Sequence, residues 1–513
     1  MKTGNEIPAG LPEKRCMTDA LSCSDPAVAQ AHALFDAFRS EIRGTLADGS
    51  LAASIIGKGA TVHGPLGPQP LLYADYAASG RALREVEDFV LEHVLPVYAN
   101  PHTQASHCGR SINALRRSAR AEIAWFCGAD AGDAVIFAGS GATAGLQKLV
   151  RLFGADLPDA EGRRALVLLG PYEHHSNLLP WRESGAEVIE LPEGADGGPD
   201  RAALAEVLKV GKGRKVIAAF SAGSNVTGAL TDVAAVSRMV QAAGGKVIWD
   251  YAGAGSYIAM NMRPAPDVAV DALVFSPHKF LGGPASSGVL VVRRDAVVLD
   301  KPSAPGGGTV SFVSPSGHDY LADLAAREEA GTPNAIGDIR TALAGIVRSC
   351  MMEAGLDLRA QQMCRDALAR WRANPRIEVL GREMDEHLPI VSFRMRDGEG
   401  QLVHHQLVTR ILSDCFGIQA RGGCACAGPY VHRLLDLDEQ HSRAIYQAIR
   451  FGAELDKPGF VRVNFSPLMS NAEFAHLVTC VETIARDSAI LARHFVGNPA
   501  TAVFEPVAAS AAA

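Results

Sequence analysis

Seven short apolar runs recur between residues 71 and 295, and stretches with helical spacing separate them. Most of the runs are continuously apolar, which is typical of strands that are covered on both faces. Strands and helices that alternate in this way favour a mostly parallel sheet with helices packed on each side. The predicted strands are AVIFA (134–138), ALVLLG (165–170), EVIEL (187–191), KVIAAFS (215–221), KVIWD (246–250), ALVFS (272–276) and GVLVV (288–292).

The pattern changes before and after this region. Helical spacing over 24–46 predicts one helix near the N-terminus, and helical spacing over 337–373 predicts one long helix. Between them, a stretch rich in Gly, Pro and Ser at 301–320 predicts a long surface loop. Short strand-like and helical stretches then alternate from 389 to 467, which predicts a smaller α+β domain.

Composition limits the classes of partner. With 513 residues the chain is too long for one ordinary core, so two or three domains are expected. The formal net charge of -7 and the lack of a basic block argue against a nucleic-acid partner. No apolar run is long enough for a membrane span, and we expect a cytoplasmic protein whose cysteines are free thiols. There, the close thiol pair at 424 and 426 indicates metal, redox or nucleophilic chemistry.

Lys279 is the first candidate for chemistry, because it directly follows the apolar run at 272–276. A lysine at the end of a buried strand is partly desolvated, which makes its neutral amine available for Schiff-base formation. Ser276 and His278 lie beside it in the sequence. The ordinary alternative for a lysine is a solvated charge.

Asp250 ends the run KVIWD and leads into YAGAGSY, whose small residues leave space for a ligand. Open α/β sheets bind ligands at the carboxyl ends of their parallel strands. An aspartate there can pair with the ring nitrogen of pyridoxal phosphate and keep it protonated, so that the ring accepts electrons. Capping a helix is the ordinary alternative role.

The stretch FAGSGATAGLQKLV (137–150) predicts a strand, a glycine-rich turn and a helix start. The amides of Gly141 and Ala142 at such a helix start can hold a phosphate, and Thr143 adds a hydroxyl. Glycine turns before helices are common, so this turn alone does not identify a ligand. YEHHSNLLPW (172–181) follows another apolar run, and one of its histidines can face a bound aromatic ring.

These motifs occur in an order that resembles the class V aminotransferase superfamily of pyridoxal-phosphate enzymes, and within it the cysteine desulfurases and selenocysteine lyases. The resemblance runs from Tyr73 to Ser466 and implies a fold-type-I enzyme with a large α/β domain and a smaller C-terminal domain. It rests on the segments YADYAASG, GSGATAG, EHHSNLLPW, SAGSNVTGAL, SPHKFLGGPASSGVLVV, REEAGTPNAIGDI and VRVNFSP.

The expected domain organisation follows. Residues 1–70 are an N-terminal extension whose one helix packs on the small domain. Residues 71–335 form the large pyridoxal-phosphate-binding domain, with a mostly parallel seven-stranded type of sheet. Residues 336–496 supply a linking helix and the small domain with the cysteine loop, and 497–513 are a disordered tail.

The resemblance also implies roles for single residues. His174 stacks on the cofactor ring and acts as an acid or base, and Asn225 approaches the phenolic oxygen of the cofactor. Lys279 holds the cofactor covalently. Thr332 lies on a loop that, in the family, reaches the cofactor phosphate of the other subunit, so a homodimer is expected.

The stretch RGGCACAGPY (421–430) places two thiols one residue apart and looks like neither a helix nor a strand. Aligned by Arg421 and its alanine–x–proline ending, it resembles the catalytic cysteine loop of the family, which puts the sulfur-accepting thiol on Cys426. Cys424 falls where many relatives have a histidine or another polar residue. We expect Arg421 to supply the positive charge that favours a thiolate. Arg462 matches the arginine that pairs with the carboxylate of the substrate.

Three features differ from the family pattern. Gly253 stands where the family often has a glutamine, and Ala144 stands where an acidic or polar residue is common. A helical insert at 431–460 separates the cysteine loop from the arginine motif by more chain than compact relatives have.

The expected reaction removes sulfur from L-cysteine and leaves L-alanine and a persulfide on Cys426. A protein acceptor would then take the sulfur from this persulfide. A selenocysteine lyase, another C–S lyase, an epimerase or an aminotransferase on the same scaffold are the alternatives. A more remote alternative is a metal-binding protein in which Cys424, Cys426, His404 and His405 hold zinc. C-x-C is not a usual zinc spacing, so no metal is expected.

Overall fold

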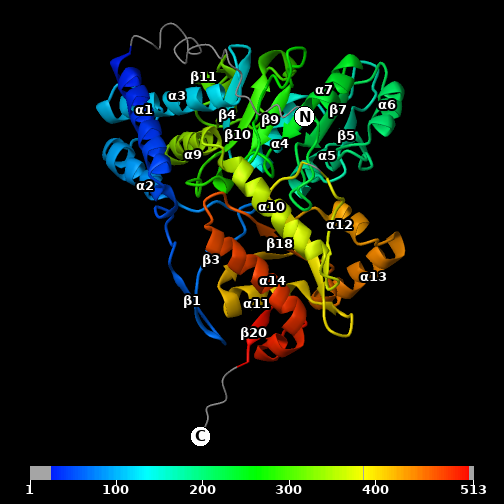
Figure 1. The fold of residues 1–513 in the computed structure, drawn as a ribbon. Helices are drawn as coiled ribbons and strands as arrows, with labels where there is room; N and C mark the ends of the chain where they lie inside the picture. Colours follow the sequence, from blue (N-terminus) through cyan, green and yellow to red (C-terminus); the bar gives the residue numbers. More distant parts are fainter. Residues whose placement is uncertain (1–24, 385, 508–513) are drawn as a thin grey trace. The chain divides into compact units, whose positions relative to one another are not determined.

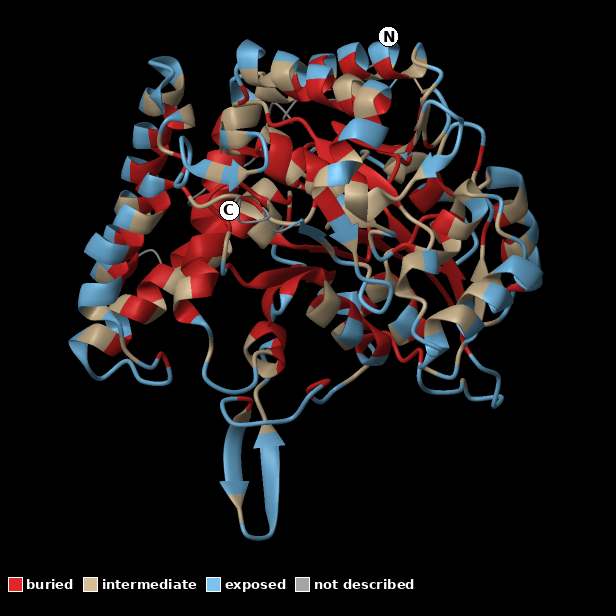
Figure 2. Cartoon of the chain, turned by 90° about the horizontal axis from the view of Figure 1, so that it is seen from below, coloured by how far each residue is buried: buried red, intermediate tan, exposed pale blue. Residues whose placement is uncertain are grey.

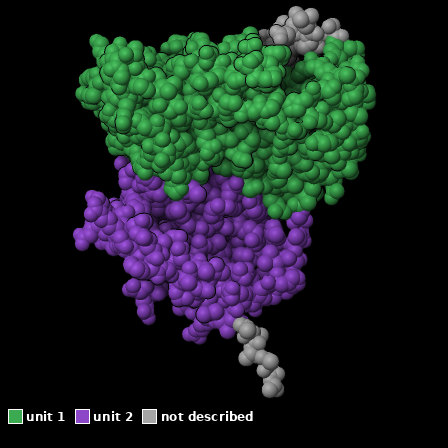
Figure 3. All heavy atoms as spheres, turned by 180° about the vertical axis from the view of Figure 1, so that it is seen from behind, with its two compact units in different colours: residues 1–56, 79–223, 230–354 green, residues 57–78, 224–229, 355–513 purple. Residues whose placement is uncertain are grey.

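The computed structural model describes residues 25–384 and 386–507 of the chain (Figure 1). The chain divides into two compact units, coloured in Figure 3. Unit 1 comprises residues 1–56, 79–223 and 230–354, and unit 2 comprises residues 57–78, 224–229 and 355–513. Two short segments, 57–78 and 224–229, therefore belong with the C-terminal part of the chain, which the sequence pattern did not indicate.

Unit 1 contains a seven-stranded sheet with the order β4-β10-β9-β8-β7-β5-β6. Only β10 runs antiparallel to its neighbours, so the expected mostly parallel α/β sheet is confirmed. Six of the strands are almost entirely buried, as their continuous apolar runs predict, while β6 at the edge of the sheet is partly exposed (Figure 2). Their bounds are β4 (Asp133–Gly139), β5 (Leu166–Leu169), β6 (Glu187–Glu190), β7 (Val216–Ser221), β8 (Lys246–Asp250), β9 (Ala272–Phe275) and β10 (Gly288–Arg293).

Helices of unit 1 connect these strands and flank the sheet (Figure 1). The longest buried one, α9 (Ala335–Glu353), has buried residues on all sides, which is typical of a helix in the middle of a domain. The others are α1 (Pro26–Ala47), α2 (Arg84–Phe89), α3 (His107–Phe126), α4 (Gly141–Leu152), α5 (Leu179–Arg182), α6 (Arg201–Val210), α7 (Val233–Ala242) and α8 (Leu324–Glu328).

The N-terminal helix α1 packs on α3 and α9 of unit 1. This differs from the expectation that it packs on the small domain. Phe35 and Phe38 of its apolar face each lie 5.6 Å, centroid to centroid, from the ring of Phe89. Arg39 of the same helix forms a buried ion pair with Glu122 of α3, so both apolar and charged contacts hold α1 in unit 1.

The region 301–320 is not one long loop. It contains an antiparallel hairpin of β11 (Val310–Ser314) and β12 (Gly317–Tyr320), whose side chains are mostly exposed. A strand pair with no buried face lacks the apolar alternation by which strands are recognised in a sequence, so the Gly/Pro/Ser composition was the stronger local signal.

Unit 2 is built on an antiparallel sheet in the order β13-β14-β18-β17, with β15 beside β14. Its core includes Trp371, Phe393 and Phe465, all fully buried. The sheet strands are β13 (Ile377–Val379), β14 (Ile390–Arg396), β15 (Leu402–Val403), β17 (Arg421–Gly423) and β18 (Phe460–Asn464). The helices are α10 (Leu356–Arg372), α11 (His405–Phe416), α12 (Gly428–Leu434), α13 (Glu439–Arg450) and α14 (Asn471–Leu491).

Three further strand pairs complete the described chain. β1 (Thr61–Gly64) pairs with β2 (Gly67–Pro70), and β3 (Leu72–Tyr73) runs parallel to β16 (Ile418–Gln419). β19 (Phe495–Gly497) pairs with β20 (Phe504–Pro506), where a disordered tail was expected from residue 497. The ring of Phe504 packs against the core of unit 2, which explains this order. Residues 508–513 of the expected tail, like 1–24 of the extension, lie outside the described residues.

The long helix expected over 337–373 is two helices, α9 and α10. Gly355 between them adopts a positive φ of 69°, a backbone conformation that ends a helix and that glycine adopts without strain. The boundary between the two units falls at this residue, since α9 belongs to unit 1 and α10 to unit 2.

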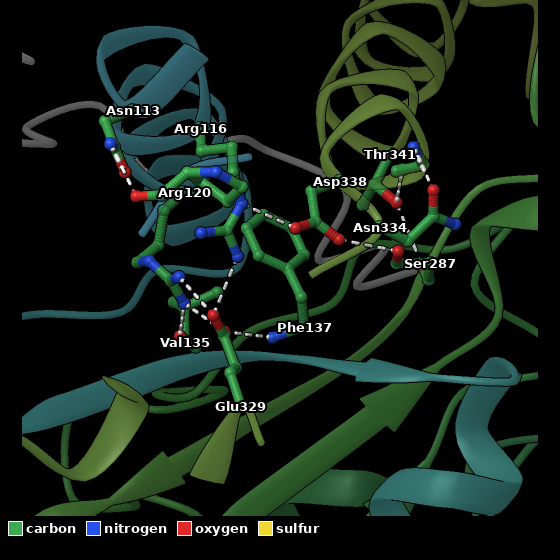
Figure 4. A network of polar contacts seen from close by, with 12 residues as sticks. Asn113, Arg116, Arg120, Val135, Phe137, Ser287, Glu329, Asn334, Asp338 and Thr341 are labelled. Atoms are coloured by element: carbon green, nitrogen blue, oxygen red, sulfur yellow. Dashed lines mark hydrogen bonds and ion pairs between the residues drawn. The ribbon is translucent and has the colours of Figure 1, made fainter. Parts of the chain in front are cut away.

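Two carboxylates hold the segment that precedes α9 (Figure 4). Glu329 accepts hydrogen bonds from Arg116 Nη2 and Arg120 Nη2, both at 2.9 Å, and from the amide of Phe137 at 2.8 Å. Asp338 of α9 accepts one from Arg116 Nε at 2.8 Å. Burial alone would raise the pKa of Glu329, but Arg120 and Arg116 hold it below its ordinary value. The segment is therefore anchored at both ends by buried charge pairs.

We expect Glu329→Gln to lower the free energy of unfolding of the chain by about 3 kcal/mol, because it leaves two partly buried guanidiniums, those of Arg116 and Arg120, with one carboxylate. Chemical denaturation of the wild-type and variant proteins measures this difference. Glu161→Gln is the control, since Glu161 pairs with Arg163 at the surface and exposed pairs contribute little. Equal effects of the two substitutions would contradict the importance of the buried network.

Candidate functional site

The candidate residues of unit 1 follow the carboxyl ends of parallel strands. Asp250 is the last residue of β8, and Ser276 to Lys279 follow β9. His174 follows β5, and Gly141 to Thr143 follow β4. Because these strands run in the same direction, the side chains gather at one edge of the sheet.

Burial shifts the pKa values of two groups beside Lys279, those of Asp250 and His278. Burial raises the pKa of Asp250, while the amide of Ala252, which donates to Asp250 Oδ1 at 2.8 Å, and the charge of Lys279 lower it. Burial, and then the neighbouring Lys279, lower the pKa of His278 to about 4. His278 is therefore neutral near pH 7, while the net effect on Asp250 is a pKa above its ordinary value.

The glycine turn lies against the lysine segment. The amide of Ala142, in the first turn of α4, donates to Ser276 Oγ at 2.9 Å. Gly141 has a φ of 61°, and a Cβ added to it would lie 3.0 Å from the same oxygen. A Cβ on Gly288 of β10 would lie only 2.1 Å from the carbonyl oxygen of Gly141. Both glycines are thus required for this close approach, and the amides of α4 face the segment that contains Lys279.

Hydroxyl groups connect the turn to His174. Thr143 Oγ1 lies 2.7 Å from Ser176 Oγ, and the amide of Ser176 donates to His174 Nδ1 at 3.1 Å. Because Nδ1 accepts a hydrogen bond from an amide, it carries no proton itself, and the proton of the neutral ring is on Nε2. The ring orientation and tautomer of His174 are thereby set by its own turn.

Glu173 is a functional candidate to which the sequence gave no role. It is buried and accepts hydrogen bonds from the Ser221 amide at 2.8 Å, Ser221 Oγ at 2.6 Å and Asn177 Nδ2 at 2.6 Å. Burial raises its pKa to about 7, and the nearby Asp250 adds to this. Glu173 stands in the segment YEHHSNLLPW, but its partner Ser221 is 48 positions away. The sequence therefore did not predict that Glu173 is buried.

In unit 2, two arginines lie opposite each other on neighbouring strands. Arg421 of β17 pairs in register with Arg462 of β18. Asp75 accepts from both, with 2.9 Å from Arg462 Nη2 to Oδ1 and 2.9 Å from Arg421 Nε to Oδ2. Arg462 Nη1 also donates to the backbone oxygen of Asn225 at 3.0 Å. Asp75 is the second functional candidate that the sequence motifs did not single out.

The cysteine stretch is more ordered than its composition suggests. β17 ends at Gly423, α12 begins at Gly428, and the amide of Ala427 donates to the oxygen of Cys424 at 3.1 Å. Ala425 and Cys426, the central residues of this turn, have φ values of 49° and 54°, as in a type I′ turn. Asn225 Nδ2 donates to the oxygen of Ala425 at 2.9 Å. Both thiols are exposed, and the turn is held from outside by Asn225.

The structure also places three other sequence candidates, Thr332, His404 and His405. Thr332 is exposed on the segment between Glu329 and Asp338. His404 and His405 stack on each other at a centroid distance of 4.4 Å, at the start of α11. Among residues 25–384 and 386–507, no group of three or more His, Cys, Asp or Glu side chains is placed to hold a metal ion. Within the same residues, no helix combines the length and apolar character of a membrane span.

Comparison with known proteins gives the same fold and family. A cysteine desulfurase from Enterobacter sp. (strain 638) is 28% identical over 367 residues, which cover 70% of this chain and 85% of the relative. A probable cysteine desulfurase from Pyrococcus abyssi is 28% identical over 372 residues, covering 71% and 87%.

Solved structures agree with the fold. The apo structure of a cysteine desulfurase from Thermococcus onnurineus NA1 has a TM-score of 0.66 at 23% identity and covers 81% of this chain and 94% of its own. The cysteine desulfurase CsdA from Escherichia coli has a TM-score of 0.63 at 22% identity and covers 80% and 94%. The expected fold-type-I class is thereby confirmed. The model of the Aminotransferase class-V family matches residues 72–474, and the chain belongs to this family.

Proposed function

We propose that this chain is a pyridoxal-phosphate-dependent cysteine desulfurase, which converts L-cysteine to L-alanine and keeps the sulfur as a persulfide on Cys426. The relatives named cysteine desulfurase support the reaction class. The observation that carries the proposal is the turn of the cysteine stretch, in which an exposed thiol is presented by a strained backbone.

The edge of the sheet in unit 1 fits pyridoxal phosphate. The hydroxyls of Thr143 and Ser276 offer donors for a phosphate at the start of α4, where the amide of Ala142 holds Ser276 Oγ in place. The buried carboxylate of Asp250 suits a protonated ring nitrogen, and Lys279 suits the aldehyde. When bound, the cofactor supplies an electron sink for bonds at the Cα of an amino acid.

Different residues of unit 1 would then have different roles in moving and holding protons. The amine of Lys279, when released, would take the proton from the Cα of the substrate and return it at Cβ or Cα. His174 would face the ring, and in its neutral form Nε2–H can donate a hydrogen bond there. Neutral His278 would add no second positive charge next to the amine of Lys279.

The residues of unit 2 would bind the substrate and take its sulfur. Arg462 would pair with the substrate carboxylate, since a guanidinium matches a carboxylate with two parallel hydrogen bonds. The thiolate of Cys426 would attack the substrate sulfur, so that the S–Cβ bond breaks as the S–S bond forms. L-cysteine and one thiol thus give L-alanine and one persulfide, with no external oxidant or reductant.

The turn suits this task. Left-handed backbone costs about 1–2 kcal/mol per non-glycine residue, and such strain persists where the surroundings enforce it. Ala425 and Cys426 both adopt it, and the hydrogen bond from Asn225 holds the peptide between them. A thiol that collects sulfur and passes it to an acceptor has to change position, and a strained turn resists such a change less than a regular helix or strand. Arg421, which was expected to favour the thiolate, instead pairs with Asp75.

A homodimer remains part of the proposal. Thr332 is exposed on a segment whose two ends are fixed by Glu329 and Asp338. A rigid, exposed loop of this kind suits contact with the cofactor phosphate of a second copy, as the family resemblance implies.

The central test is incubation of the purified protein with pyridoxal phosphate and L-cysteine, with and without a reductant, while alanine and sulfide are measured. Borohydride reduction followed by peptide mapping should label Lys279, and Lys279→Ala should lose both the label and alanine formation. A label on another lysine would show that the cofactor assignment is wrong. Release of pyruvate in place of alanine would favour a different C–S lyase.

We expect the two exposed thiols to differ. Cys426→Ser should lower alanine formation by about 100-fold or more, since it removes the nucleophile and leaves the cofactor residues intact. Cys424→Ser is the matched control and should retain most of the turnover. Mass spectrometry of the cysteine-treated protein should find the added sulfur on Cys426. Added sulfur on Cys424 alone would reverse the assignment.

The buried Glu173 predicts a pH dependence of stability. Its folded pKa of about 7 exceeds the ordinary value of 4.5, so between these values the folded state keeps a proton that the unfolded state releases. The contribution of Glu173 to the free energy of unfolding therefore falls from pH 4.5 to 7, by about 3 kcal/mol in total. Glu173→Gln, which cannot titrate, should gain stability relative to the wild type between pH 5 and pH 8. A difference between the two proteins that stays constant with pH would show that Glu173 does not titrate in this range.

A further inference from the structure

Arg421 and Arg462 are two positive charges that lie close together. They lie directly opposite each other on the antiparallel strands β17 and β18, and like charges in this position destabilise a strand pair. The side chain of Arg462 is only 3% exposed, so water does little to screen its charge. The carboxylate of Asp75 lies between them, with one oxygen on each guanidinium at 2.9 Å.

The backbone fixes Asp75 in this place. Its neighbour Ala74 donates through its amide to the oxygen of Gln419 at 2.9 Å and accepts from the amide of Asn464 at 2.8 Å. The amide of Ala77 donates to Asn464 Oδ1 at 3.0 Å. The segment that carries Asp75 is thus hydrogen-bonded to residues from both sides, next to β16 and at the end of β18. These bonds fix the backbone on either side of Asp75, and the two arginines orient its carboxylate.

We propose that Asp75 is the positioning residue of the substrate-carboxylate site: it fixes the fork of Arg462 and cancels one of the two charges of the Arg421–Arg462 pair. This inference rests on the proposed role of Arg462 in substrate binding. Two guanidiniums and one carboxylate leave one positive charge, which one further carboxylate balances. With Asp75 present, the two arginines therefore favour a ligand that has one carboxylate and a neutral side chain, such as cysteine. Dianions bind less well.

Without Asp75 the two arginines would carry two uncompensated charges. Such a site attracts doubly charged anions, and Arg462 keeps its hydrogen bond to the oxygen of Asn225 but loses the one that orients Nη2. Removing Arg421 as well would leave the single positive charge of Arg462 and restore the original balance. A residue with a purely structural role would not be rescued by a second substitution that removes one more hydrogen bond.

The test uses the full-length protein with pyridoxal phosphate and compares the wild type, Asp75→Asn, Arg421→Gln and the double variant. Asp414→Asn is the matched control, because Asp414 is 7% exposed, as against 8% for Asp75, and also pairs with an arginine of unit 2. Thermal stabilisation by sodium sulfate is measured against sodium chloride of equal ionic strength. The KM and kcat for L-cysteine are measured with and without sulfate.

We expect Asp75→Asn to bind sulfate at a concentration about tenfold or more below that of the wild type, and sulfate to inhibit it competitively with cysteine. Its KM for cysteine should rise about tenfold or more, and its kcat should change less. The double variant should return to within about threefold of the wild type in both measurements. Asp414→Asn should resemble the wild type in both.

Two results would overturn the proposal. One is sulfate binding by Asp75→Asn that equals that of Asp414→Asn. The other is a double variant whose KM for cysteine is higher than that of Arg421→Gln alone. This second comparison tests the role of Asp75 even if the single variant Asp75→Asn does not fold. If the wild type forms no alanine from cysteine, the proposed function fails, and the sulfate measurements still test Asp75 separately.

Discussion

Parallel pairing is the constraint on which the candidate cofactor site depends. Every strand of the sheet in unit 1 except β10 runs in one direction, so segments that leave β4, β5, β8 and β9 emerge at one edge. Those segments contribute the amides of α4, His174, Asp250 and Lys279, which are up to about 140 positions apart in the chain. Burial of β4, β5, β8 and β9 on both faces keeps this edge rigid, because none of these four strands can shift its register without exposing apolar side chains.

Carboxylates paired with arginines are the second feature that recurs in the structure. Glu329 and Asp338 share Arg116, and Asp75 is shared by Arg421 and Arg462. Apart from Arg421, whose side chain is about half exposed, these charged groups are buried or partly buried, so removing one partner would cost stability. Glu173 is different, because it has no cationic partner among its hydrogen bonds and is satisfied by neutral donors. This explains why burial raises the pKa of Glu173 while arginines lower that of Glu329.

The two units differ in how they carry their candidate residues. In unit 1 the polar groups are preorganised by hydrogen bonds, such as those from Ala142 to Ser276 and from Ser176 to His174. In unit 2 the exposed thiols lie on a strained turn, while Arg462 is buried and paired with Asp75. Rigid groups suit binding and proton transfer, and a strained, exposed turn suits a nucleophile that moves.

The sequence by itself determined the seven strands of unit 1, the class of fold and the family, because continuous apolar runs and short motifs are local properties. It also pointed to Lys279, Asp250 and the glycine turn as residues that follow strands. Only the tertiary structure decided which distant segments meet. It placed 57–78 and 224–229 in unit 2, divided the long helix at Gly355 and ordered the segment up to β20. It also gave Glu173 and Asp75 their partners, Ser221 and the two arginines. Those partners lie 48 to 387 positions away, and no pattern of neighbouring residues encodes which remote groups will surround a buried carboxylate.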